Sequence, residues 1–244
     1  MINKLQLQSI IDKYYLGLNE SVKWVIKDKK ISIDFMTPTK DVIGSVICDN
    51  FSMEDGNLAI YDTKKLQNLI SICNGDLLLE LEKNNAIYTK LKISDLNFNL
   101  TYALSDPLLI NKVGTVNVQD WVVELDLTSE DVTNLIKAKS ALSLIDNMLI
   151  TTTKNLDNEK VVEFVFGDEA GHNNKITYQI QGRVEELNLQ IPYNSDVFKT
   201  ILQSNKDMDG GKLLLSSMGL LKFEFSKDGI SSEYFMVRRA ETSF

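Results

Sequence analysis

The chain has 244 residues, which fits one large domain or two domains of modest size. Hydrophobic residues make up 43% of it and charged residues 25%, which is typical of a globular protein and argues against a disordered or collagen-like chain. The net charge of −8 excludes a basic protein that coats DNA directly, because a negative surface repels phosphates.

In chain order, four segments show the apolar spacing of three and four residues that is typical of an amphipathic helix. They are expected at residues 3–15, at 62–73, from 128 and from 194 onward. Polar residues suited to helix capping, such as Asp62 and Thr128, stand at their starts. In the first helix the buried stripe is expected to hold Leu5, Ile10, Ile11 and Tyr14, with Leu7 outside it.

The rest of the chain consists mostly of short runs rich in Val, Ile, Phe and Tyr, which predict β-strands. Turn signals at Asp28-Lys29, Asn84-Asn85 and Asp228-Gly229 predict hairpins between neighbouring runs. Strands are expected at 22–26, 31–35, 42–48, 77–81, 97–102, 122–127, 161–166, 176–180, 187–191, 212–216, 221–225 and 234–238.

The order of helices and strands repeats in the second half of the chain, which indicates an internal duplication. Similar strings flank the second and fourth helices, with three leucines at 77–79 after one and at 213–215 after the other. The sequence therefore predicts an α+β protein with domains at 1–105 and 121–244, joined by a connector at 106–120.

Catalytic and metal-binding motifs are not found. There is no G-x-S-x-G string, no P-loop and no glycine-rich dinucleotide motif, and His172, the one histidine, lies in a polar loop. Residues 205–210 resemble the start of a calcium loop, but Ser216 stands where the bidentate glutamate is needed. We therefore expect no enzymatic activity, no metal and no cofactor.

The two cysteines, Cys48 and Cys73, are too few for a disulfide scaffold or a four-ligand zinc site. No apolar run reaches the ~18 residues needed to span a membrane, and the first residues carry no secretory-signal pattern. We expect a cytoplasmic protein that binds no membrane.

Charge is sorted along the chain. The helical segments carry eight lysines and five acidic residues, a net charge of +3, whereas the remainder carries −11. If the four helices line one surface, that surface is positive. Lysines on the exposed face of an amphipathic helix are also common without any function, so this interpretation stays open. The eight lysines are Lys4, Lys13, Lys64, Lys65, Lys137, Lys139, Lys199 and Lys206.

Residues 55–62 read Asp-Gly-Asn-Leu-Ala-Ile-Tyr-Asp and are followed by the leucines and isoleucines of the second helix. This stretch resembles DNA sliding clamps, most closely the polymerase processivity clamps of T-even-type bacteriophages. Residues 105–107 at the connector and residues 212–215, 222–224 and 234–237 near the end also fit. The strings 57–59 and 234–235 are similar to cellular clamps of the proliferating cell nuclear antigen type.

The resemblance implies a duplicated DNA-clamp fold that closes into a homotrimeric ring, with antiparallel sheets outside and two helices per domain inside. The eight helix lysines would then face duplex DNA passing through the ring. The implied partners are a DNA polymerase and a clamp-loader ATPase, bound at an apolar pocket beside the connector. By position, the candidates for this pocket are Met36, Val42, Leu108, Leu109, Phe235 and Val237.

A phage clamp would act in the cytoplasm of an infected bacterial cell, and the resemblance also implies a platform role in late transcription. The segment 152–174 is longer than expected for such clamps, and Arg238-Arg239 stands near the end of the sequence. The alternatives are a monomeric phage-encoded β-rich structural or protein-binding module, in which the lysines face solvent, and a hydrolase built around His172.

Overall fold

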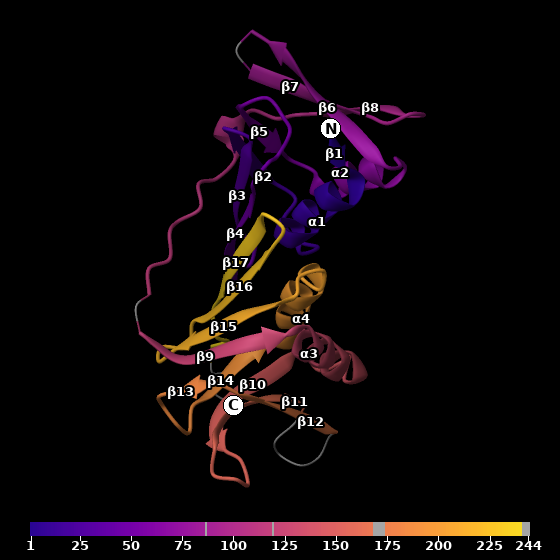
Figure 1. The fold of residues 1–244 in the computed structure, drawn as a ribbon. Coiled ribbons are helices and arrows are strands. Elements are labelled where there is room, and N and C mark those ends of the chain that lie inside the picture. The colour runs from indigo at the N-terminus through magenta and orange to yellow at the C-terminus, as the bar shows by residue number, and fades with distance from the viewer. Residues whose placement is uncertain (86, 119, 168–173, 241–244) are drawn as a thin grey trace. The chain divides into compact units, whose positions relative to one another are not determined.

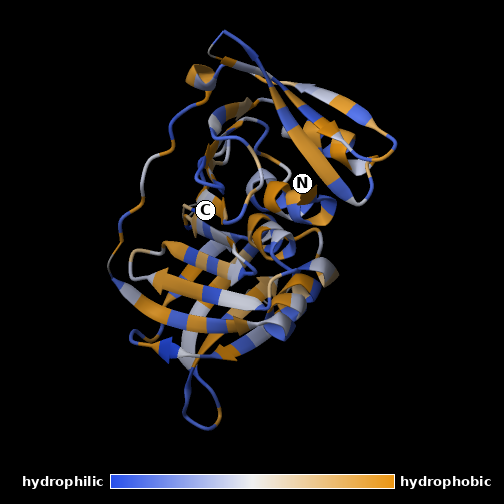
Figure 2. Cartoon of the chain, turned by 45° about the horizontal axis from the view of Figure 1, so that its top comes forward, coloured by the Kyte–Doolittle hydropathy of each residue, from blue (hydrophilic) through white to orange (hydrophobic). Residues whose placement is uncertain are grey.

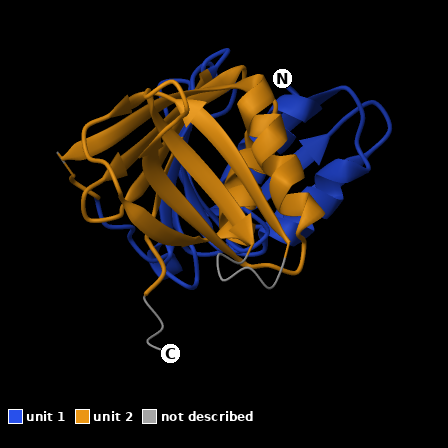
Figure 3. Cartoon of the chain, turned by 90° about the horizontal axis from the view of Figure 1, so that it is seen from below, with its two compact units in different colours: residues 1–115, 227–232 blue, residues 116–226, 233–244 orange. Residues whose placement is uncertain are grey.

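The computed structural model describes residues 1–244 except 86, 119, 168–173 and 241–244. The chain folds into two compact units, coloured blue and orange in Figure 3. The first unit holds Met1–Thr115 together with Lys227–Ser232, and the second holds Val116–Ser226 and Glu233–Phe244. The border at 115/116 falls inside the expected connector, whereas the assignment of 227–232 to the first unit differs from the expected division.

The first unit contains two antiparallel sheets (Figure 1). One has the strand order β5-β2-β3-β4 and the other β1-β6-β7-β8. The strands are β1 (Ile2–Asn3), β2 (Val22–Lys27), β3 (Lys30–Met36), β4 (Val42–Cys48), β5 (Gly56–Ile60), β6 (Asp76–Asn84), β7 (Ile87–Ser94) and β8 (Asn99–Ala103).

Its helices are α1 (Lys4–Tyr15) and α2 (Thr63–Ser71), which contact each other, with α1 packed on β3 and β4. Asn3 caps α1 and Asp62 caps α2 by accepting backbone N–H groups of the first turn. A short 3₁₀ helix, η1 (Pro107–Leu109), opens the connector.

The second unit repeats this arrangement. Its sheets have the orders β14-β10-β11-β12 and β13-β9-β15-β16-β17, so each sheet of the first unit has a counterpart with the same sequential connections. The strands are β9 (Trp121–Thr128), β10 (Asn147–Lys154), β11 (Lys160–Gly167), β12 (Lys175–Gln181), β13 (Arg183–Val184), β14 (Gln190–Asn194), β15 (Gly210–Ser216), β16 (Leu221–Lys227) and β17 (Ile230–Met236). The end of β16 and the start of β17, within residues 227–232, are assigned to the first unit. Helices α3 (Ser129–Ala141) and α4 (Ser195–Ser204) contact each other. The predicted duplication is thus confirmed.

Alternation of apolar and polar residues forms the core of each unit, as the banding of the strands in Figure 2 shows. In β3 the side chains of Ile31, Ile33 and Phe35 are buried. In the second unit Phe198 of α4 packs against Phe164 and Phe223, with ring centroids 5.8 Å and 5.5 Å apart.

Some elements differ from the expectation. The strands β1, β5, β7, β10 and β13 are not among those expected from the sequence. β7 has only two buried side chains, Leu91 and Ile93, and β10 is rich in threonine, so neither has a clear apolar alternation. In α1 the buried stripe holds Leu7, whereas Leu5 is 73% exposed. Leu7, Ile10, Ile11 and Tyr14 follow the i, i+3, i+4, i+7 pattern more closely than a stripe that starts at Leu5.

None of the helices in the described ranges is both long and apolar enough to cross a lipid bilayer. Nor do any three His, Cys, Asp or Glu side chains within those ranges gather into a metal-binding group. The side chain of Asn205, in the calcium-like string, donates to the Ile201 carbonyl and to the Tyr234 hydroxyl, at 2.8 Å and 2.9 Å. His172 lies outside the described residues.

Candidate nucleic-acid interface and connector pocket

The buried face of α2 determines which of its lysines are exposed. Leu66 and Ile70 are buried, and this orientation leaves Lys64 and Lys65 exposed. Both lysines lie in the first turn, where the helix dipole favours anions and disfavours cations. The N–H groups of this turn are already bonded, because Lys64 N–H donates to Glu20 Oε2 at 3.1 Å and Lys65 N–H donates to Asp62 Oδ1 at 2.8 Å. Only the side chains of the two lysines are therefore left to meet a phosphate.

In the second unit the exposed lysines lie on both helices. Lys137 is exposed on α3, Lys199 is half-buried on α4, and Lys206 is exposed in the turn after α4. Within the described part of the chain, none of these three lysines, nor Lys64 or Lys65, forms an ion pair.

Several lysines on the strands are different, because acidic side chains neutralise them. Glu82 pairs with Lys90 and Lys92 at 2.7 Å and 3.1 Å, and the hydrogen bonds from these lysines lower the pKa of the Glu82 carboxyl. Similar pairs are formed by Lys30, Lys83, Lys212 and Lys222. Helices α2, α3 and α4 therefore carry lysines that no acidic side chain of the described residues pairs with, although α3 and α4 each hold as many acidic residues as lysines.

Three of the eight predicted lysines, Lys4, Lys13 and Lys139, have structural roles, because their Nζ atoms donate hydrogen bonds within the chain. Lys4 Nζ donates to the carbonyl oxygens of Ser71 and Cys73, at 2.7 Å and 2.5 Å, and so caps the C-terminal end of α2. Lys13 is fully buried, and its Nζ donates to Ser9 Oγ at 2.8 Å.

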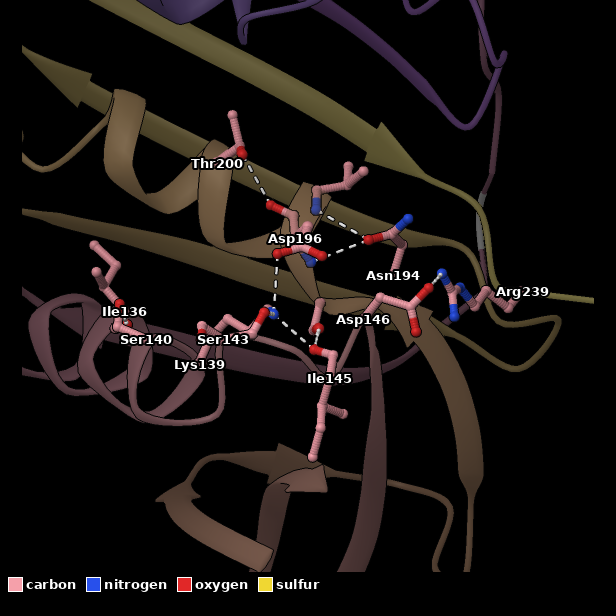
Figure 4. A network of polar contacts seen from close by, with 12 residues as sticks. Ile136, Lys139, Ser140, Ser143, Ile145, Asp146, Asn194, Asp196, Thr200 and Arg239 are labelled. Carbon is pink, nitrogen blue, oxygen red and sulfur yellow. Dashed lines mark hydrogen bonds and ion pairs between the residues drawn. The ribbon is translucent and has the colours of Figure 1, made fainter. Parts of the chain in front are cut away.

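Lys139 lies at the centre of the network in Figure 4 and is 1% exposed. Its Nζ donates to the carbonyl oxygens of Ser143 and Ile145, at 3.1 Å and 2.6 Å, and pairs with Asp196 Oδ1 at 2.9 Å. Nearby, Arg239 pairs with Asp146 at 2.7 Å and lowers the pKa of its carboxyl. Burial leaves Lys13 and Lys139 no surface with which to meet a phosphate, contrary to the expectation from sequence.

A pocket of about 340 Å³ lies beside the connector in the first unit. Residues 34–38 and Lys40, from β3 and the turn after it, form one wall, and residues 109–113 form the other. Two of the predicted partner-binding residues, Met36 and Leu109, line this pocket. Asp106 caps η1 by accepting the Leu108 N–H at 2.9 Å. Within this short helix, Leu108 is 90% exposed and Leu109 is 73% exposed.

The other predicted pocket residues lie elsewhere. Val42 is fully buried in β4, where its backbone pairs with Thr37. Phe235 and Val237 belong to the second unit, and neither lines the pocket. Sequence reasoning missed Pro38, Ile110 and Val113, although the apolar residues that follow Leu109 in the connector were a usable signal.

No family model and no curated protein sequence matches the chain. Its structure is similar to the proliferating cellular nuclear antigen from Entamoeba histolytica, with a TM-score of 0.75 and 14% identity over 98% of this chain and 96% of the other. A similar match joins it to A. fulgidus PCNA bound to the C-terminal region of FEN-1, with a TM-score of 0.77 and 14% identity over 99% and 98% of the two chains. PCNA from Thermococcus kodakaraensis gives a TM-score of 0.75 and 14% identity over 98% of each chain. The chain therefore has the duplicated fold of PCNA-like sliding clamps.

Proposed function

We propose that this protein is a DNA sliding clamp, in which three copies form a ring around duplex DNA and tether a replicative DNA polymerase. The observation that carries the proposal is the combination of a clamp fold with unpaired lysines on α2, α3 and α4. Unpaired lysines attract phosphates, whereas the acidic side chains elsewhere in the chain repel them. Contacts to phosphates without base contacts permit sliding along any sequence.

The DNA-facing residues of this proposal are Lys64, Lys65, Lys137, Lys199 and Lys206. Lys4 belongs to the same surface through its helix, but most of its hydrogen-bonding capacity is used at the end of α2. Lys13 and Lys139 are left out of the proposal because they are buried.

Two edge strands support assembly into a ring. Strand β8 ends the sheet β1-β6-β7-β8, and β12 ends the sheet β14-β10-β11-β12. Open edges of this kind are usually covered, since unpaired N–H and C=O groups invite pairing with another chain. We propose that β8 of one copy pairs with β12 of the next.

The connector pocket is the proposed docking site for the polymerase and for the clamp loader, whose peptides would contact Met36, Leu108 and Leu109. The clamp itself performs no chemistry in this role, and the ATP is hydrolysed by the loader. The resemblance to T-even-type phage clamps extends the proposal to a phage protein that acts in the infected bacterial cell and serves as a platform for late transcription.

Native mass by light scattering is the first test, because three copies of 27.6 kDa predict about 83 kDa. The second is retention on a nicked circular plasmid, which should be lost when the plasmid is linearised. A concentration-independent monomer that is not retained would contradict the clamp and favour the monomeric binding module.

A further inference from the structure

The turn between β2 and β3 carries three lysines within four residues: Lys27, Lys29 and Lys30. Lys27 and Lys30 are paired directly across the two strands, an arrangement in which like charges destabilise a hairpin. Asp49 Oδ1 lies 3.3 Å from Lys30 Nζ and compensates the charge of this lysine. Across the described ranges, Lys27 and Lys29 form no ion pair.

Lys29 also has a backbone conformation that is unfavourable for any residue with a Cβ atom. Asp28 and Lys29 have φ angles of 53° and 59°, as in a two-residue turn that prefers Asn-Gly or Asp-Gly. The β16–β17 hairpin meets this preference with Asp228 and Gly229, at φ angles of 50° and 78°. Glycine would fit this position without strain, as it does in the β16–β17 hairpin, so the side chain of Lys29 is not required by the turn itself.

The turn is held rigidly by the segment that follows β4. The Asp28 N–H donates to Asp55 Oδ1 at 3.1 Å, and the Phe51 N–H donates to the Lys29 carbonyl at 2.7 Å. Phe51 is itself buried against Trp24, with ring centroids 6.4 Å apart. The backbone that carries the lysines is therefore fixed before any ligand arrives, which lowers the entropy lost on binding.

The lysines surround a hollow of about 520 Å³, whose wall includes Val25, Ser32 and Asn50. Asp28 and Asp49 also line it. Because Trp24, Ile26, Ile31 and Ile33 point into the core, Lys27 and Lys30 lie on the opposite face of the sheet from the core that α1 covers. The hollow is thus separate from the helix lysines of the same unit that are proposed to face DNA.

We propose that this hollow binds a short acidic segment of another protein, whose carboxylates pair with Lys27 and Lys29. Ser32 and Asn50 supply hydrogen-bonding groups for the segment, and Val25 supplies an apolar contact. The two lining aspartates disfavour a nucleic-acid backbone, which bears a charge at every phosphate. A peptide can place neutral residues beside Asp28 and Asp49 and carboxylates beside the lysines.

The test uses a fluorescently labelled eight-residue peptide of alternating Glu and Ser, with binding followed by anisotropy at low salt. Replacing the two unpaired lysines, Lys27→Gln with Lys29→Gly, should weaken binding about tenfold, since each exposed ion pair contributes a few-fold. The control, Lys90→Gln with Lys92→Gln, makes the same change in net charge in the same unit and should alter affinity by less than about twofold.

The single change Lys29→Gly separates binding from folding. Glycine fits the turn, so this variant should keep or raise the thermal midpoint while binding the peptide more weakly. The proposal is overturned if the wild-type protein does not bind the peptide at millimolar concentration, or if the control pair loses as much affinity. Tighter binding of an eight-nucleotide thymidine oligomer, with the same dependence on Lys27 and Lys29, would likewise overturn it in favour of a nucleic-acid site.

Discussion

The ammonium group of Lys139 lies 2.9 Å from the carboxylate of Asp196 and so joins the last turn of α3 to the first turn of α4. The lysine side chain is 2% exposed and the aspartate side chain 60% exposed. A cation near the end of one helix and an anion near the start of the next both suit the helix dipoles. This pair fixes the relative position of two helices that carry the exposed lysines Lys137 and Lys199.

Replacing Lys139 by methionine keeps the apolar stem but removes the Lys139 donor from the carbonyl oxygens of Ser143 and Ile145 and leaves Asp196 without its ion-pair partner. The Ile145 carbonyl keeps its second donor, Ser195 Oγ, at 2.8 Å. We expect Lys139→Met to lower the free energy of unfolding by about 1–3 kcal/mol, measured by urea denaturation. Lys137→Met is the matched control on the same helix, and because Lys137 is exposed its effect should stay within about 0.5 kcal/mol. Equal losses in the two variants would contradict a structural role for Lys139.

The burial of Lys13 and Lys139 could have been predicted from helical spacing. Lys139 follows the buried Leu135 by four residues, and Lys13 follows the buried Ile10 by three, so each lies on the apolar face. Lys64 and Lys65, by contrast, precede the buried Leu66 and point outward. The prediction grouped all helix lysines by charge and did not consider whether each lies on the buried or the exposed face of its helix.

The connector pocket could be predicted only in part. The two leucines at 108–109 could be recognised in the connector sequence. Residues 34–38, which form the other wall of the pocket, are separated from the connector by about 70 residues of sequence. Such long-range contacts depend on how sheets and loops pack and leave no local pattern. The duplication was predictable because periodicity and turn signals repeat along the chain.

Reversing the charge at Lys64 and Lys65 should weaken the hold on DNA. We expect the double variant with Lys64→Glu and Lys65→Glu to reduce retention on circular DNA and polymerase stimulation while the native mass is unchanged. Each lost phosphate contact should reduce the salt dependence of DNA binding by a slope of about 0.9. The control changes Lys90 and Lys92 to Glu, and an equal loss of retention there would show a general charge effect only.

Gly56 in β5 lies directly against the ring of Tyr88, where a Cβ atom would overlap the aromatic carbons. The Tyr88 hydroxyl lies 2.8 Å from the Asp55 carbonyl oxygen and 3.0 Å from Glu54 Oε1. Gly56→Ala should displace the ring and lower the free energy of unfolding by about 1–3 kcal/mol. In a Tyr88→Ala background most of this cost should disappear, and an undiminished cost in that double-mutant cycle would point to backbone strain instead.

Asp95 should contribute to acid sensitivity. Its carboxylate accepts backbone N–H groups of Asn74, Asn97 and Phe98 at 2.6–2.7 Å, and these hydrogen bonds lower its pKa. Because the folded pKa lies below the unfolded value of about 3.9, this stabilisation is present above pH ~4 and is lost as the pH falls through the folded pKa. Asp95→Asn should flatten the fall of stability below pH ~4 in urea titrations, and a fall as steep as in the wild-type chain would contradict this role for Asp95.

The edge of β8 offers the sharpest test of ring assembly. The Leu104 N–H donates to the Thr89 carbonyl at 2.8 Å, so alternate residues direct their N–H groups toward β7, and the N–H of Thr101 points away from it. Thr101→Pro therefore removes a donor from the open edge without breaking the ladder to β7. We expect the monomer to keep its circular dichroism spectrum while the mass by light scattering falls from about 83 to about 28 kDa.

Thr101→Val is the matched control, because it keeps the N–H group and removes only the hydroxyl. It should assemble like the wild-type chain, since strand pairing depends on the backbone donor. If Thr101→Pro still forms a trimer, the subunit interface does not include β8. If both variants are monomers, the interface depends on the Thr101 side chain and not on its backbone N–H. Retention on circular DNA should follow the mass in each case, because a chain that cannot close a ring has no topological hold on the duplex.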